Sequence, residues 1–275
     1  MSKPRRIAGA ALAVVILFGA AAWAQRGRFQ PYSEIPAYAG DSDFHFLRLA
    51  FRDARGFNRG FGFSSRSGVG RGWWVVDMPE AEDHFTAGIH RLTRIDVGAP
   101  RYLQIMDDRL FDYPWLYATN VGYWDLSEAE TARLRDYLLR GGFLVFDDFW
   151  GPSEWETFQE GMSRILPGRP ISDMDETDPV MHVLYDIQQK DRTFIPGSRH
   201  LWRGAGGSVQ VMQPPGTAPA WRAMYDDQKH LIVAINYDTD VGDAWEFADV
   251  PYYPEAMTAL AYRYGINYII YSMTH

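Results

Sequence analysis

Short apolar runs recur along the chain between longer mixed stretches, and this pattern predicts a series of strands. Residues 143–146 and 231–235 contain no polar side chain, which is typical of strands buried on both faces of a parallel sheet. Residues 266–271 follow Gly265 and are also predicted to form a strand. Further strands are predicted at residues 44–51, 101–106 and 115–119.

Segments with helix start and stop signals separate these strands. Ser127 and Glu130 have the spacing of a capping box, and Gly141 ends the helix that they begin. Other helices are predicted at residues 77–93, 153–166 and 254–264, an irregular excursion at 190–222 and an acidic loop at 238–250. Because strands and helices alternate, the fold class is predicted to be α/β, with a three-layer, doubly wound and mostly parallel sheet.

The first residues have the layout of a secretory signal peptide. Basic residues precede an apolar run at residues 7–22, and Ala22 and Ala24 stand at the positions of a small-residue cleavage site. We therefore expect a signal peptide at residues 1–24, a tether at 25–42, a single domain at 43–275 and a periplasmic location. The alternative is an uncleaved anchor in the inner membrane formed by residues 7–23, with no other membrane contact.

Composition narrows the function classes. The chain of 275 residues has no cysteine, which excludes disulfides, thiolate metal sites and a cysteine nucleophile. Its formal charge is −8, and removal of residues 1–24, which hold Lys3, Arg5 and Arg6, changes it to −11. Such an acidic chain is not expected to bind nucleic acid, so the Gly- and Arg-rich residues 54–72 are predicted to be a surface loop.

Familiar catalytic motifs are absent. The chain contains no G-x-S-x-G elbow, no G-x-x-x-x-G-K-[ST] phosphate loop and no H-E-x-x-H zinc motif. Its seven histidines are scattered without the spacing of metal ligands, and among them His182 is kept as a candidate to assist catalysis. The carboxylates are therefore the better candidates for a functional site.

Acidic side chains gather where two of the buried strands end. Asp147 and Asp148 follow residues 143–146, and a second polar set follows residues 231–235: Asn236, Asp238, Asp240, Asp243 and Glu246. Because ligands bind at the carboxyl ends of strands in such sheets, these ends predict a cleft. The cofactor is not determined, but carboxylate oxygens can hold a divalent cation. The alternative is that the acids only cap helices and hold loops.

Several segments jointly resemble one bacterial family. They are residues 74–83 with 91–93, residues 126–130 and 134–149, residues 242–246, and residues 265–275. Most of the stretch from 43 to 275 resembles domain of unknown function 4159. The resemblance implies a flavodoxin-like fold similar to class I glutamine amidotransferases, which mount a catalytic cysteine at a strand–helix elbow. This chain has no cysteine, so amidotransferase activity is not expected. It also has Asp178-Pro179 and Trp150 where the family tends to have histidines.

Two functions remain open at this point. The first is a non-catalytic exported domain that binds an envelope protein or a small polar or carbohydrate ligand. Its cleft would be lined by Asp147, Asp148, Asn236, Asp238, Asp243 and Trp245. The second is a carboxylate- or metal-dependent hydrolase of envelope glycans or peptides, with Asp147 or Asp148 as base or metal ligand and His182 in support. Whether the protein is an enzyme is left undecided by the sequence.

Overall fold

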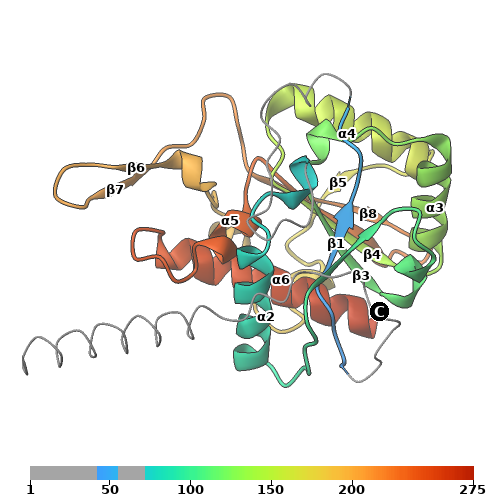
Figure 1. Cartoon of the computed structure of the whole chain (residues 1–275), viewed down its shortest axis with the longest axis horizontal. Coiled ribbons are helices and arrows are strands. Elements are labelled where there is room, and N and C mark those ends of the chain that lie inside the picture. The colour runs from blue at the N-terminus through green and yellow to red at the C-terminus, as the bar shows by residue number, and fades with distance from the viewer. Residues whose placement is uncertain (1–41, 55–71) are drawn as a thin grey trace, which may run out of the picture.

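A mostly parallel sheet forms the centre of the protein (Figure 1). The computed structural model describes residues 42–54 and 72–275, and within them seven strands form one sheet in the order β2-β1-β3-β4-β9-β8-β5. In that order the strands are β2 Arg101–Gln104, β1 Leu47–Ala50, β3 Trp115–Thr119, β4 Phe143–Asp147, β9 Leu231–Tyr237, β8 Ala220–Tyr225 and β5 Ser172–Asp173.

The first five strands of that order are parallel to one another, β8 is antiparallel to β9, and β5 is antiparallel to β8. Numbered along the chain, the parallel strands stand in the order 2-1-3-4-5, which is the order of flavodoxin-like sheets. The direction in which successive strands are added to the sheet reverses between β1 and β3. The carboxyl ends of these two strands therefore lie at a topological switch point. The predicted three-layer α/β fold is confirmed.

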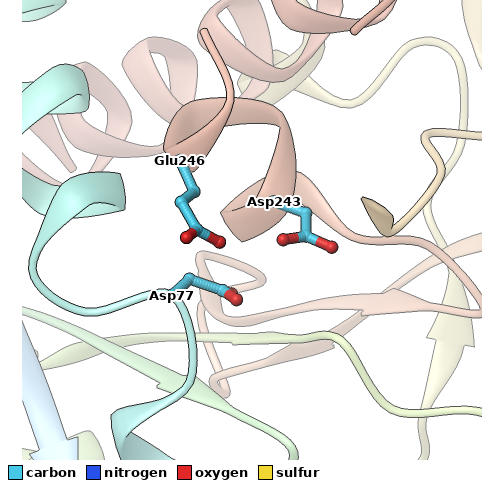
Figure 2. Close-up of side chains that lie close together, drawn as sticks. All are labelled: Asp77, Asp243 and Glu246. Carbon is cyan, nitrogen blue, oxygen red and sulfur yellow. The ribbon is translucent and has the colours of Figure 1, made fainter. Parts of the chain in front are cut away.

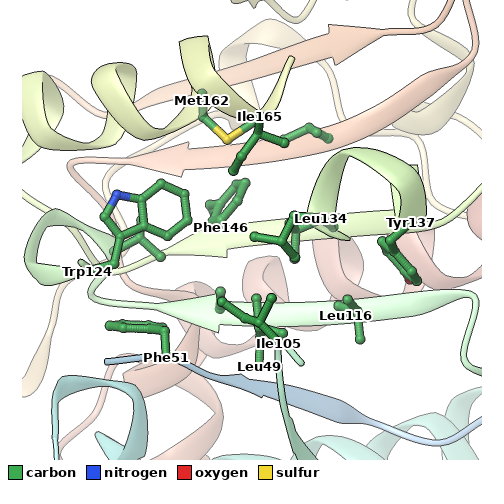
Figure 3. Close-up of a cluster of buried hydrophobic side chains, with 14 of the residues drawn as sticks. Leu49, Phe51, Ile105, Leu116, Trp124, Leu134, Tyr137, Phe146, Met162 and Ile165 are labelled. Atoms are coloured by element: carbon green, nitrogen blue, oxygen red, sulfur yellow. The ribbon is translucent and has the colours of Figure 1, made fainter. Parts of the chain in front are cut away.

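Helices cover both faces of the sheet. On one face lie α3 Glu128–Leu139 and α4 Gly151–Ile165, and Figure 3 shows their core residues, including Leu134 and Met162, against the strands. On the other face lie α2 Glu80–Leu92, α5 Val241–Glu246 and α6 Glu255–Thr274. Strand β3 packs against both layers of helices, because successive side chains of a strand point to opposite faces of the sheet. Leu116 lies in the core on the side of α3 and α4, and Tyr117 lies in the core on the side of α2, α5 and α6.

The helix predicted from the capping box is present. The side chain of Ser127 accepts a hydrogen bond from the amide of Glu130 at 3.3 Å, and the amide of Ser127 donates to the Glu130 carboxylate at 2.8 Å. Gly141 follows the helix with φ at 95°, a conformation that glycine adopts without strain. Local sequence therefore determines both ends of α3.

The strand predicted at residues 266–271 is wrong. These residues continue α6, which runs without a break past Gly265. A Cβ at Gly265 would lie 2.5 Å from the Phe85 ring and 2.7 Å from the Trp245 ring, so glycine here permits close packing instead of ending the helix. The run is apolar because nearly all of this part of α6 is buried, and periodicity does not distinguish a short buried helix segment from a strand.

Two segments predicted to be irregular contain regular elements. The acidic loop at 238–250 includes α5, which begins where the Asp240 side chain accepts a hydrogen bond from the Asp243 amide at 2.7 Å. The excursion at 190–222 includes a hairpin of β6 Leu201–Arg203 and β7 Val209–Val211 and the start of β8. Figure 1 shows this hairpin projecting from the body of the protein. Both corrections concern elements too short for a periodic pattern to show.

The predicted signal peptide or anchor and the glycine-rich loop lie almost wholly outside the described residues. This applies to residues 1–41, which include the range 7–23, and to residues 55–71. Among residues 42–54 and 72–275, none of the helices combines the length and apolar character needed to cross a membrane.

Candidate functional site

Three neighbouring parallel strands end in sharp turns at the same edge of the sheet. Asn120 follows β3, Asp148 follows β4 and Asp238 follows β9, and their φ angles are 54°, 48° and 54°. Asn and Asp are the side chains that best tolerate this left-handed conformation. The turns redirect the chain as it leaves the sheet, at the edge where α/β proteins bind ligands.

A cleft lies beside this edge. Its volume is about 410 Å³. It is lined by four acidic residues of two segments and by Asn120, Asp148 and Arg199, together with apolar and small side chains: Asp77, Glu80, Asp243, Glu246, Trp73, Val75, Val76, Met78, Ser198 and Phe247. A second cavity of about 350 Å³ shares Trp73, Asn120 and Arg199 with the first and adds Tyr123, Trp150 and His200. The first cavity is called the acidic cleft below.

Five carboxylates converge at the acidic cleft and are called the acidic cluster: Asp77, Asp148, Asp240, Asp243 and Glu246. One oxygen each from Asp77, Asp148 and Asp240 lies within 4.8 Å of the other two, and the same holds for Asp77, Asp243 and Glu246. Figure 2 shows the second set, with Asp243 and Glu246 extending from α5 toward Asp77. The spacing of three residues places Asp243 and Glu246 on one face of that helix.

The acidic cluster is crowded with negative charge. Burial, followed by repulsion from Asp243 and Asp148, raises the pKa of Asp77 well above its ordinary value. Burial and then Asp148 likewise raise the pKa values of Asp240 and Asp243. Arg199 opposes this charge, and its Nη2 donates to Asp148 Oδ1 at 2.9 Å.

Two buried oxygens of the cluster have no hydrogen-bond partner within residues 42–54 and 72–275. They are Oδ2 of Asp77 and Oδ2 of Asp240, and only 1% of the Asp240 surface is exposed. Buried polar atoms nearly always have a hydrogen-bond partner in folded proteins, so the two unpartnered oxygens require a physical explanation. An all-oxygen set of carboxylates is the donor set that suits Mg²⁺, Mn²⁺ or Ca²⁺. The residues therefore fit a hard divalent cation.

Of the adjacent pair predicted from the sequence, only Asp148 belongs to the acidic cluster. Asp148 accepts hydrogen bonds from Asn120 Nδ2 at 2.7 Å and from the Trp150 indole. Asp147 points to the face of the sheet that α5 covers. There its Oδ2 accepts hydrogen bonds from the Tyr117 hydroxyl at 2.7 Å and from the first two amides of α5 at 2.9 Å. Burial raises the pKa of Asp147 to about 7, against the lowering effect of these hydrogen bonds.

The other predicted residues are placed as follows. Asn236 accepts a hydrogen bond from the Tyr268 hydroxyl at 2.9 Å, and Asp238 accepts from the amides of Gly151 and Ala218 at 2.8 and 2.9 Å. These contacts hold the turn after β9 against its neighbours.

Two further candidates lie away from the cleft lining. Trp245 is 1% exposed and stacks on Phe85 with ring centroids 4.0 Å apart, so its ring faces the core. His182 bonds to Asp186 and to the Glu176 carbonyl, and it lines neither of the two cavities described above.

Sequence reasoning missed Asp77 and Arg199 as site residues. Asp77 was predicted only as the first residue of a helix, yet α2 begins at Glu80, and Asp77 lies before it with φ at 68° and its carboxylate in the cluster. Arg199 lies in the segment predicted to be irregular. Asp240 and Glu246 stood in the polar set after β9 without being singled out. The sequence feature that could have identified Asp240 and Glu246 is the spacing of a short helix, with Asp240 as its N-cap.

Comparison with known proteins identifies the family. No curated protein matches the chain. The model of the family described as domain of unknown function (DUF4159) matches residues 66–273, a range that includes every residue of the acidic cluster. The chain therefore belongs to the DUF4159 family.

Proposed function

We propose that this protein is an exported domain of the cell envelope that binds a divalent cation in the acidic cleft and, beside it, a small polar ligand. The observation that carries the proposal is the convergence of five carboxylates around buried oxygens that have no hydrogen-bond partner. In the absence of a cation these charges repel one another, and a bound cation turns the repulsion into binding energy.

The walls next to the cation position support a polar ligand. Half of the Arg199 side chain is exposed, and its guanidinium lies 5.2 Å from the centre of the Trp150 ring. Burial and Arg199 lower the pKa of His200 to about 4, so the imidazole is neutral near pH 7 and can both donate and accept hydrogen bonds. Trp73 stacks on Tyr123 with centroids 4.2 Å apart and lines both cavities.

The turn at Asp148 supports the likeness to class I amidotransferases. Asp148 stands between β4 and α4 with φ at 48°, a sharp strand-to-helix turn of the kind that mounts a nucleophile in such folds. With an aspartate at this elbow and no cysteine in the chain, the proposed role is to hold a cation and not to transfer an amide.

Thermal unfolding with added cation tests the proposal. We expect Mn²⁺ at about 100 times its dissociation constant to stabilise the full chain by about 2.7 kcal/mol. For a protein of this size the midpoint then rises by about 5–10 °C. Asp148→Asn keeps a side chain that tolerates the left-handed turn and removes the ligand charge, so its midpoint should rise by much less than that of the wild type.

A matched control separates specific binding from general screening. Asp173→Asn removes an exposed carboxylate outside the cleft, so this variant should respond to Mn²⁺ as the wild type does. An equal response of all three proteins, or none in the wild type, would contradict the proposal. Hydrolysis of an envelope glycan or peptide that disappears in Asp148→Asn would favour the hydrolase alternative, and cell fractionation tests the periplasmic location.

A further inference from the structure

The acidic cluster consists of two sets of three carboxylates, and Asp77 belongs to both. We infer that the acidic cleft holds two divalent cations side by side, with Asp77 as their shared ligand. Asp148 and Asp240 complete the first position, and Asp243 and Glu246 complete the second. This inference rests on the proposed function, because it assigns a second cation to the same cleft.

The geometry places the two positions next to each other. Within each set the three ligand oxygens lie within 4.8 Å of one another, a spacing that one cation can close by drawing them in. A single carboxylate has two oxygens and can contact two cations at once. Sites in which two cations share ligands hold them roughly 3.5–4 Å apart.

Unpartnered buried oxygens point to the same region. Oδ2 of Asp77 is the oxygen of the shared residue that lacks a partner, and Oδ2 of Asp240 lacks one although the residue is only 1% exposed. A point in the Cβ direction of Gly197 lies 2.8 Å from Asp240 Oδ2 and 3.1 Å from Asp243 Oδ2. The unpartnered Oδ2 of Asp240, in the first set, therefore lies near Asp243 of the second set.

Two glycines make room for this convergence. A Cβ at Gly242 would lie 2.6 Å from Asp77 Oδ2, and a Cβ at Gly197 would meet the two oxygens just described. Neither glycine has a positive φ, so neither is required by a turn. Because these glycines have no side chain, Asp77, Asp240 and Asp243 can approach the backbone closely.

Charge balance favours two cations over one. Arg199 bonds to Asp148 and also acts on Asp240 and Asp243, while Arg48, which acts on Asp77, is already paired with Glu82. Among the described residues, full ionisation of the cluster therefore leaves four negative charges that Arg199 does not compensate, which two divalent cations cancel and a single one does not. The donor set contains only carboxylate oxygens, so the cations are of the hard class of Mg²⁺ and Mn²⁺.

Counting bound Mn²⁺ tests the inference on the full chain. Calorimetric titration of the wild type should give two Mn²⁺ per chain, and electron paramagnetic resonance at low temperature should show a magnetically coupled pair. Glu246→Gln removes a ligand of the second position only, so one uncoupled Mn²⁺ should remain. Asp240→Asn removes a ligand of the first position, so one Mn²⁺ should remain at the second. Asp77→Asn should weaken the Mn²⁺ affinity of both positions by at least tenfold.

A control variant removes a charge that lies outside the cleft. Asp173 is exposed and belongs to neither set, so Asp173→Asn should still bind two coupled Mn²⁺. One Mn²⁺ in the wild type, or two uncoupled ones, would overturn this inference and leave the proposed function standing. No bound Mn²⁺ at all would overturn both. Two Mn²⁺ retained in Glu246→Gln would show that the second position lies elsewhere and would also overturn the inference.

Discussion

Two groups of buried charges lie close together in this protein and differ in how they are balanced. The first is the pair formed by Arg48 on β1 and Glu82 on α2, whose side chains are fully buried. Arg48 also donates to the carbonyls of Trp74 and Val76 at 3.1 and 2.7 Å. One Arg48 nitrogen and one Glu82 oxygen lack hydrogen-bond partners, but the two charges are matched within the chain.

The second group is the acidic cluster, in which the charges are not matched. In the part of the chain that the structure describes, Arg199 bonds to one of the five carboxylates, and Arg48, which also acts on Asp77, is already paired with Glu82. A matched buried pair is part of the fold, because the attraction between the two charges replaces the hydration that each loses on burial. An unmatched buried cluster costs stability unless something outside the chain supplies the missing charge. The difference therefore separates a structural group from a binding group, and removal of one member should have opposite effects in the two.

The largest effect is expected in the matched pair. Arg48→Met leaves Glu82 buried without a counter-charge, so we expect a loss of about 3–5 kcal/mol in the free energy of unfolding. Urea denaturation in EDTA measures it. The double variant Arg48→Met, Glu82→Leu removes both charges and should recover much of the loss. A loss below about 1 kcal/mol in the single variant would mean that the pair does not contribute as proposed.

The opposite sign is expected in the unmatched cluster. A folded-state pKa raised by burial and by Asp148 means that the ionised Asp240 carboxyl destabilises the fold above its ordinary pKa. Asp240→Asn keeps an N-cap residue for α5 and removes the charge, so without cation at pH 7 we expect a gain of about 1–2 kcal/mol. Urea denaturation in EDTA checks this.

Adding Mn²⁺ should reverse that order. The wild type gains about 2.7 kcal/mol at 100 times the dissociation constant, and the variant gains less because it has lost a ligand. Asp173→Asn, which lacks an exposed carboxylate, should show neither the gain in EDTA nor the reversal. A destabilised Asp240→Asn protein in EDTA would place Asp240 with the structural charges.

The sequence predicted the framework of the fold better than the site. The buried strands at β3, β4 and β9 and the capped helix α3 depend on neighbouring residues, so their patterns are visible locally. Residues 266–271 show the limit, since a buried helix and a buried strand have the same apolar composition. What decides between them is packing against α2 and α5, which no local pattern contains.

The acidic cluster was predicted in part for a related reason. Asp148 and Asp243 were found because the carboxyl ends of parallel strands meet at one edge. The choice between Asp147 and Asp148 depends on the left-handed turn at Asp148, which the sequence does not show. Asp77 and Arg199 come from loops far apart in the chain, and only the tertiary fold brings them to the cleft.

A smaller effect is expected at Tyr117, which lies between the matched pair and Asp147. The Arg48 guanidinium lies 5.1 Å from the centre of its ring, and its hydroxyl donates to Asp147. Tyr117→Phe keeps the ring and removes one hydrogen bond, so we expect a loss of about 1 kcal/mol. Asp147 keeps the two amides of α5, and Mn²⁺ affinity should stay within about twofold, a change of about 0.4 kcal/mol. A larger loss of affinity in calorimetry would mean that the groups are coupled through this side chain.

The smallest effect is expected where a matched pair lies at the surface. His182 and Asp186 are 40% and 60% exposed, and the Glu176 carbonyl together with Asp186 raises the pKa of His182 above 6.5. A raised pKa adds stability that is complete below the ordinary pKa and disappears as the pH rises through the raised value. His182→Gln should therefore cost less than about 0.5 kcal/mol at pH 5.5 and nothing at pH 8.5, because solvent screens an exposed pair. Urea denaturation at the two pH values measures the difference. A cost near that of Arg48→Met would mean that pairing alone, without burial, decides how much a charge contributes.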